Sequence, residues 1–260
     1  MRTKRPIVCM FLLCFACVPQ AMAGPLIGAT LDAIYDIDPI TGVASNLRAT
    51  GGRTFEIAFA DGILYGTTGN ILSILDAASG ESQLLGTITG LEVFEPIRDL
   101  TWNTQTGTLF ALAHLGGTPI DRLYTIDTSA LAATFIGELD AQYTTIAFDA
   151  SGALYAISPS LDVISLIDPT TAGTLASTSL TEDIQSGTMV FAEMDQLIVS
   201  ARIAGDTGFV FNLNPSDGTL SDIGRTGLDV GLTSLAYIPE PSTCCLVLFG
   251  FLWYFVRRCA

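Results

Sequence analysis

The fold is decided by residues 145–173, TIAFDASGALYAISPSLDVISLIDPTTAG, a series of short apolar segments separated by turn-forming residues. The segments are rich in Ile, Leu, Phe and Tyr, and Gly, Asp, Ser and Pro lie between them, which is typical of β-strands joined by tight turns. The stretch has no long helical periodicity. It therefore predicts a unit of three or four strands.

The same series recurs along the chain. Units begin at Phe55, Asp99, Thr145 and Thr188, which gives a period of about 43 to 46 residues. A repeat of this length with four strands is typical of propeller blades, because one such sheet cannot bury both of its faces alone.

The ends of the repeat region match incomplete units. Residues 26–48 correspond to the second half of a unit, and residues 234–237 correspond only to its first strand. We expect the two ends to complete one blade together, which leaves no open sheet edge between the first and last units. The sequence thus predicts an all-β fold, a five-bladed β-propeller similar to secreted propeller-like repeat proteins. A β-sandwich or β-solenoid is the alternative, because both accept short strands at this spacing.

Cysteine content and charge separate the ends of the chain from its middle. All six cysteines lie near the termini, at positions 9, 14, 17, 244, 245 and 259. Disulfides, thiolate metal sites and cysteine catalysis are therefore excluded from residues 24–238. These residues contain six arginines and 25 acidic residues, a net charge of −19. Such a charge argues against nucleic acid as a partner, because phosphate contacts need basic side chains.

The first 23 residues have the organisation of a signal peptide. Basic residues precede an apolar run over residues 7–18, and the small residues Ala21 and Ala23 precede Gly24. The pattern predicts export and cleavage after Ala23 by signal peptidase. An uncleaved anchor is the alternative, although the run is shorter than the roughly 20 apolar residues of a spanning helix.

The C-terminal tail has three parts in a fixed order: Pro239-Glu240-Pro241, an apolar segment over residues 244–256, and Arg257-Arg258. Over residues 239–260 it resembles the PEP-CTERM sorting signal of Gram-negative bacteria, which is also labelled an ice-binding protein C-terminal domain. The resemblance implies recognition by an exosortase, a membrane protease that cuts near Pro-Glu-Pro. It also implies a protein of the cell envelope, the cell surface or the extracellular matrix.

The apolar segment of the tail predicts a short transmembrane helix. Its 13 residues would extend about 20 Å at 1.5 Å per residue, whereas the hydrocarbon core is roughly 30 Å thick. Snorkelling of Arg257 and Arg258 and local thinning of the bilayer would cover the difference. We therefore expect a marginal anchor suited to a temporary hold, with an anchor that is never processed as the alternative.

The repeat domain lacks the usual signatures of an active site. His114 is its single histidine and no Gly-x-Ser-x-Gly sequence occurs, so a Ser-His-Asp triad and a two-histidine metal site are not expected. An Asp or Asn ends the third strand of each unit, and we expect these residues to cap turns rather than bind calcium. They are Asp38, Asp76, Asp127, Asp168 and Asn214. The strongest calcium candidate is the cluster of Asp32, Asp36 and Asp38, since positions 36 and 38 share a strand face.

An aromatic residue ends the first strand of each unit. The five are Phe59, Trp102, Phe148, Phe191 and Tyr237. Their recurrence once per blade predicts packing between neighbouring sheets, in preference to a sugar-binding surface.

Two functions are compatible with these features. The first is an exported, non-enzymatic propeller that binds exopolysaccharide or envelope proteins and is sorted by its tail. The alternative is a secreted hydrolase or lyase acting on polysaccharide or a lactone, with acids such as Asp99, Asp149 and Asp195 near strand ends. We expect the first, because no catalytic set is evident.

Overall fold

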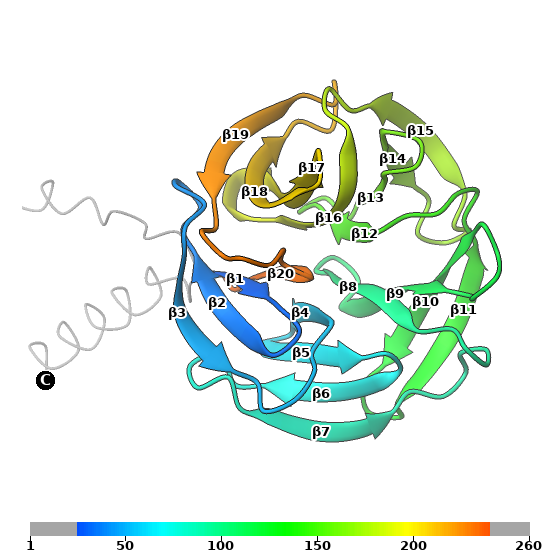
Figure 1. The fold of residues 1–260 in the computed structure, drawn as a ribbon. Coiled ribbons are helices and arrows are strands. Elements are labelled where there is room, and N and C mark those ends of the chain that lie inside the picture. The colour runs from blue at the N-terminus through cyan, green and yellow to red at the C-terminus, as the bar shows by residue number, and fades with distance from the viewer. Residues whose placement is uncertain (1–24, 240–260) are drawn as a thin grey trace, which may run out of the picture. The chain divides into compact units, whose positions relative to one another are not determined.

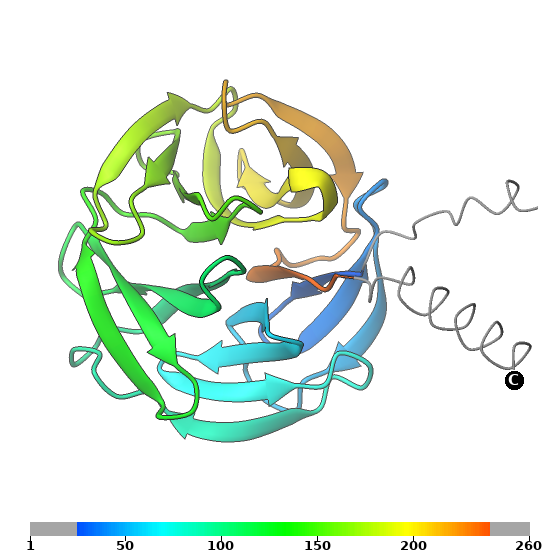
Figure 2. The ribbon, with the colours of Figure 1, turned by 180° about the vertical axis from the view of Figure 1, so that it is seen from behind.

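The computed structural model describes residues 25–239, which form five sheets of four antiparallel strands each. The sheets are arranged radially about a common axis, with one edge strand of each near the centre (Figure 1). The view from behind has the same arrangement (Figure 2). The chain is therefore a five-bladed β-propeller, as the repeat predicted, and neither a sandwich nor a solenoid.

Each blade runs from an innermost to an outermost strand. Blade 1 contains β4 (Glu56–Ala60), β5 (Ile63–Thr68), β6 (Ile71–Leu75) and β7 (Ser82–Thr87). Blade 2 contains β8 (Ile97–Asn103), β9 (Thr108–His114), β10 (Asp121–Asp127) and β11 (Ala132–Glu138). Blade 3 contains β12 (Thr145–Phe148), β13 (Leu154–Ser158), β14 (Val163–Ile167) and β15 (Thr174–Ser179). Blade 4 contains β16 (Ile184–Phe191), β17 (Leu197–Ile203), β18 (Asp206–Leu213) and β19 (Leu220–Arg225), with a 3-10 turn η1 (Glu193–Asp195).

Blade 5 is shared by the two ends of the domain. Its innermost strand is β20 (Ser234–Tyr237), followed by β1 (Leu26–Ala29), β2 (Ala33–Ile37) and β3 (Ala44–Ala49). The prediction of a shared closing blade is confirmed, although the head supplies three strands rather than the second half of a blade. Pairing of β20 with β1 joins the last strand to the first, so the ring closes through backbone hydrogen bonds.

Burial decreases from the axis outward. All four residues of β12 are buried, whereas β15 in the same blade is mostly exposed. An inner strand contacts the two neighbouring blades on its two faces, so both faces are largely buried, while an outer strand is more exposed to water. The core consists of apolar clusters between adjacent blades.

The predicted packing of the recurrent aromatic residues is confirmed at several blade interfaces. The ring centroid of Phe148 lies 4.9 Å from that of Phe110 in the preceding blade. The ring centroid of Phe191 lies 5.5 Å from that of Tyr155, which is also in the preceding blade. Phe59 and Trp102 are partly buried against clusters that contain residues of the preceding blade. These rings act as wedges between successive sheets.

Glycines allow close contact between blades at the periphery. Gly218 has φ +74°, and a Cβ there would lie 1.9 Å from the carbonyl oxygen of Ser179 in the preceding blade. Gly224 has φ +151°, and its Cβ would lie 2.2 Å from the carbonyl oxygen of Thr41. Only glycine fits such positions, because a side chain would force the blades apart.

Several predictions concern residues that the structure does not describe. The signal peptide with Ala21, Ala23 and Gly24 lies outside residues 25–239, as do Glu240, Pro241, the apolar segment 244–256, and Arg257 and Arg258. Over the described range, no helix is long and apolar enough to cross a membrane.

Candidate binding site

The five innermost strands carry two layers of side chains around the axis. One layer contains the recurrent aromatic residues at the strand ends. Three residues earlier on each strand lies a buried polar side chain, and we call this second layer the polar ring. Its members are Glu56, Asp99, Thr145, Thr188 and Ser234.

Four of the five side chains of the polar ring, all except Glu56, accept a backbone N–H group from the next blade. Thr145 Oγ1 accepts a hydrogen bond from the N–H of Met189 at 3.0 Å, and Thr188 Oγ1 from that of Leu235 at 3.1 Å. Ser234 Oγ accepts the N–H of Ile57 at 3.0 Å. The ring therefore connects successive innermost strands and satisfies donors that would otherwise be buried without a partner.

Asp99 connects blade 2 to blade 3 through its carboxylate. Its Oδ2 accepts hydrogen bonds from Thr145 Oγ1 at 2.6 Å and from the N–H of Ile146 at 2.7 Å. Its Oδ1 accepts the N–H of Leu100 at 2.9 Å. Burial raises the pKa of Asp99 to about 7, against the opposing effect of these three hydrogen bonds.

The junction between blades 1 and 2 differs from the rest of the ring, because Glu56 and Asp99 are both buried there. Burial and the charge of Asp99 raise the pKa of Glu56 well above its usual range, while Ser234 and Arg98 oppose the shift. Asp99 accepts three hydrogen bonds that favour its ionised form. We therefore assign the proton to Glu56 at neutral pH, since two adjacent carboxylates do not both ionise readily in a buried site.

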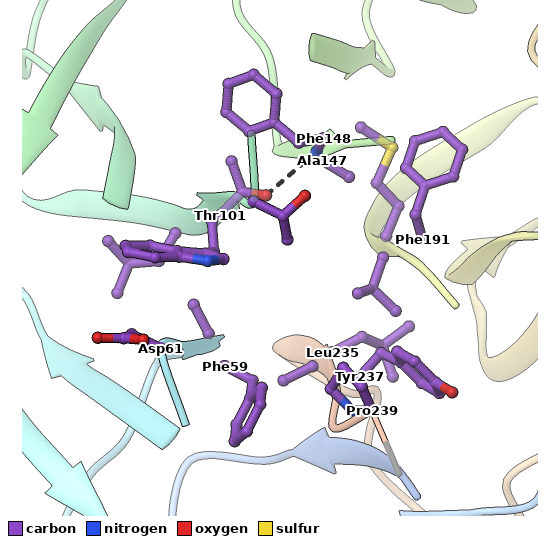
Figure 3. Close-up of a pocket in the computed structure, with 16 residues that line it drawn as sticks. Phe59, Asp61, Thr101, Ala147, Phe148, Phe191, Leu235, Tyr237 and Pro239 are labelled. Atoms are coloured by element: carbon purple, nitrogen blue, oxygen red, sulfur yellow. Dashed lines mark hydrogen bonds between the residues drawn. The ribbon is translucent and has the colours of Figure 1, made fainter. Parts of the chain in front are cut away.

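A cavity of about 200 Å³ lies beside the aromatic layer, where the ends of the innermost strands surround the axis; we call it the mouth cavity and its opening the mouth. Its wall contains residues from the innermost strand of every blade (Figure 3). Most of these are apolar, including Ala58, Leu100, Ala147, Val190 and Leu235. All five recurrent aromatic residues also line it, so the same residues pack between blades and border the cavity. The polar ring does not line this cavity.

Both ends of the described chain lie at this mouth. The N–H of Ile238 donates to the carbonyl oxygen of Pro25 at 3.1 Å, and Pro239 lines the cavity. We call this side of the propeller the terminal face. It also contains the turns that follow the first and third strands of each blade, because strand direction alternates across an antiparallel sheet.

The two faces of the propeller differ in charge. The terminal face has ten acidic residues at its turns and, over residues 25–239, no basic residue. These acids are Asp38, Asp61, Asp76, Glu81, Asp127, Asp149, Asp168, Glu193, Asp195 and Asp217. All six arginines of this range lie at or near strand ends on the opposite face, namely Arg48, Arg53, Arg98, Arg122, Arg202 and Arg225.

His114 has a structural partner that the sequence did not reveal. Its Nδ1 lies 2.7 Å from Oδ1 of the buried Asp121, whose Oδ2 accepts the N–H of Tyr143 at 2.7 Å. Burial raises the pKa of Asp121, and these contacts oppose the shift. Arg98 lies 3.9 Å from the same carboxylate. The group links blade 2 to the segment that enters blade 3.

The Asp and Asn residues at the ends of the third strands cap turns, as predicted. In each case one side-chain oxygen accepts the N–H two residues later, at distances between 2.8 and 3.1 Å for Asp38, Asp76, Asp127, Asp168 and Asn214. These hydrogen bonds lower the pKa of Asp76, whose exposed carboxylate accepts the N–H groups of Ser79 and Ala78. A turn requirement accounts for their recurrence.

The three calcium candidates have separate partners. Asp36 forms an ion pair with Arg48 at 2.5 Å, Asp38 caps its turn, and Asp32 accepts the hydroxyl of Thr30 at 3.4 Å. Within the described part of the chain, no group of three or more His, Cys, Asp or Glu side chains is placed to hold a metal ion.

Of the three acids considered for hydrolysis, Asp99 lies apart from Asp149 and Asp195, which lie near each other. Asp99 belongs to the buried polar ring, whereas Asp149 and Asp195 lie in turns of the terminal face. Asp149 Oδ1 accepts hydrogen bonds from its own turn, and Asp195 Oδ1 accepts the N–H of Ala150 at 3.0 Å. Each of the three therefore holds backbone in place.

No protein-family model matches the chain, and no curated protein sequence matches it. Solved structures resemble it in fold. A protein of unknown function from Bacteroides caccae is 10% identical, with 84% of this chain and 100% of that chain covered and a TM-score of 0.48. A luciferin-regenerating enzyme is 10% identical, with coverages of 85% and 79% and a TM-score of 0.49. A chain of the nidogen–laminin complex is 10% identical, with coverages of 82% and 97% and a TM-score of 0.56. At this identity, the last likeness supports the fold alone.

Proposed function

We propose that the chain is an exported, non-enzymatic protein of the cell surface or extracellular matrix. Its PEP-CTERM tail sorts it by exosortase-type processing, and its propeller acts as a binding scaffold. The observation that carries the scaffold role is the composition of the mouth cavity. Its wall is mostly apolar and contains one carboxylate, that of Asp61, so a pair of acids for general acid and base catalysis is missing from it.

The position of the chain ends supports attachment through a tail. Pro25 and Ile238 are hydrogen-bonded on the terminal face, and blade 5 is closed by the strands next to them. A segment that follows Pro239 can therefore be held or cut without opening a sheet. The acidic, cysteine-free surface suits a secreted domain that is not stabilised by disulfides.

Deletion of residues 240–260 tests the sorting role in a bacterium that has an exosortase. We expect the deletion to move the protein from the envelope fraction to the medium. Glu240→Ala should reduce surface display, whereas Glu193→Ala, an equivalent change in an exposed turn of the propeller, should not. An unchanged amount of the truncated protein in the envelope would show that the tail does not sort it.

A panel of polysaccharides and lactones tests the non-enzymatic role. We expect no turnover by the purified chain. If the chain does turn over a substrate, and Asp61→Asn abolishes this activity, the protein is a hydrolase or lyase and the scaffold proposal is wrong.

A further inference from the structure

The inner wall of the mouth cavity is formed largely by apolar side chains, and its polar side chains include those of Thr104 and Asp61. The wall includes Ala58, Leu100, Ala147 and Met189, whose side chains provide no strong donor or acceptor. Thr101 Oγ1 also lines the cavity, but it already accepts the N–H of Phe148 at 3.3 Å (Figure 3). A ligand that places hydroxyl groups against these apolar side chains would therefore lose hydrogen bonds to water without replacing them.

The surroundings of the cavity are strongly acidic. Asp61 is part of its lining, and its carboxylate has no hydrogen bond or ion pair to any of residues 25–239. Glu193 and Asp195 lie in η1, the turn that follows β16 on the same face. Because no basic residue of the described range lies on this face, the potential at the mouth attracts cations.

The size of the cavity limits what it can enclose. About 200 Å³ is below the range of roughly 300 to 1,000 Å³ that is usual for pockets of drug-sized ligands. It suits one extended side chain or chain end better than a whole ligand.

We propose that the mouth cavity binds a lysine side chain from a basic segment of a partner protein. The inference rests on the proposed scaffold function and names its class of partner. The four methylene groups of lysine match the apolar wall, because a lysine stem packs on apolar surface while its ammonium group stays at a polar edge. Asp61 supplies the nearby negative charge. Amino sugars also carry an ammonium group, but the apolar side chains of the inner wall offer their hydroxyls no partners.

Titration calorimetry of the full chain in non-ionic detergent tests the proposal with three probes. These are hexalysine, the same hexapeptide acetylated on every side chain, and a glucosamine tetramer. We expect hexalysine to bind, with an affinity that decreases as salt is added. We expect the acetylated peptide, which has lost its charges, and the tetramer to bind at least about tenfold more weakly.

Two pairs of variants locate the site. Thr104 is an exposed residue that lines the cavity, and Thr106 lies in the same turn outside it. Thr104→Trp should block the mouth and lower the affinity for hexalysine at least about tenfold, and Thr106→Trp should not. Asp61→Asn should lower it about threefold to tenfold. Its control is Asp162→Asn, because Asp61 and Asp162 both have positive φ, 49° and 53°, and Asp162 lies on the opposite face.

Four results would overturn the proposal. They are the absence of hexalysine binding, equal binding of the acetylated peptide, equal or tighter binding of the glucosamine tetramer, and hexalysine binding that Thr104→Trp leaves unchanged. The last would indicate attraction to the acidic surface in general. None of these results alters the location of the tail-deleted protein, so failure of the lysine site is distinguishable from failure of tail sorting.

Discussion

The aromatic layer and the polar ring lie three residues apart on the same five strands, yet they differ in access and in chemistry. Side chains of the polar ring are buried, and four of the five are hydrogen-bonded to the next blade. Residues next to the aromatic layer border an open cavity and make few polar contacts. The same five strands therefore hold the blades together with one layer of side chains and present a surface with the other. Substitutions in the two layers should therefore affect different properties.

The largest effect is expected from Asp99→Asn in the polar ring. One oxygen of the carboxylate would become an NH₂ group, which cannot accept from the N–H groups or the hydroxyl that now face it. We expect a loss of about 3 kcal/mol in the free energy of unfolding. Asp61→Asn makes the same chemical change beside the cavity and should cost less than about 0.5 kcal/mol. Urea denaturation measures both free energies of unfolding. Equal losses of stability in the two variants would show that the two layers do not differ in this respect.

A smaller effect is expected from replacing hydroxyls of the ring by methyl groups. Thr145 Oγ1 both donates to Asp99 and accepts from Met189, so Thr145→Val leaves two buried groups with one partner fewer. Thr188 Oγ1 accepts from Leu235. We expect losses of about 2 to 3 kcal/mol for Thr145→Val and about 1 to 2 kcal/mol for Thr188→Val. Denaturation curves in which Thr188→Val is the more harmful would contradict this view of the Asp99 junction.

The carboxyl pair predicts a dependence of stability on pH. In the unfolded chain Glu56 and Asp99 ionise near their ordinary pKa values of 4.5 and 3.8, but in the fold both pKa values are raised. The folded state therefore keeps protons that the unfolded state releases, and this contribution to stability decreases as pH rises from about 4 to 7. Glu56→Gln removes one titrating group and should make that decrease shallower.

Thermal unfolding measured between pH 4.5 and pH 7.5 tests the dependence. Glu193→Gln, in an exposed turn of the terminal face, is the control and should leave the slope of Tm against pH as it is in the unaltered chain. If the Glu56→Gln protein has the same slope of Tm against pH as the unaltered chain, the pH dependence does not come from Glu56.

The sequence was sufficient for the architecture because the strands and turns are local and repeated. Blade length, the shared closing blade, the turn-capping acids and the aromatic wedges all follow from residues that recur at one position per unit. The second strand of the closing blade, Leu26–Ala29, was missed because its four residues carry little pattern of their own. Its place is fixed by pairing with β20, more than 200 residues later.

The polar ring was missed although its signal is present in the sequence. Aligned on their aromatic ends, the five first strands have Glu, Asp, Thr, Thr and Ser three positions earlier. These residue types differ in charge and size, so similarity alone does not group them. What they share is an oxygen that accepts a hydrogen bond, and that role depends on the neighbouring blade. The link between His114 and Asp121 was missed for a similar reason, because it joins two strands across a loop.

The smallest effect is expected from Val190→Thr, the converse of Thr188→Val on the same strand. Val190 lines the mouth cavity and is only partly buried, so a hydroxyl there can bond to water. The change should alter the free energy of unfolding by no more than about 0.5 kcal/mol, whereas a hydroxyl that is buried without a partner costs about 1 to 3 kcal/mol. Urea denaturation of the two β16 variants side by side gives the sharpest comparison of the layers. If Thr188→Val and Val190→Thr lower the free energy of unfolding by similar amounts, the side chain at position 190 is as inaccessible to water as the polar ring.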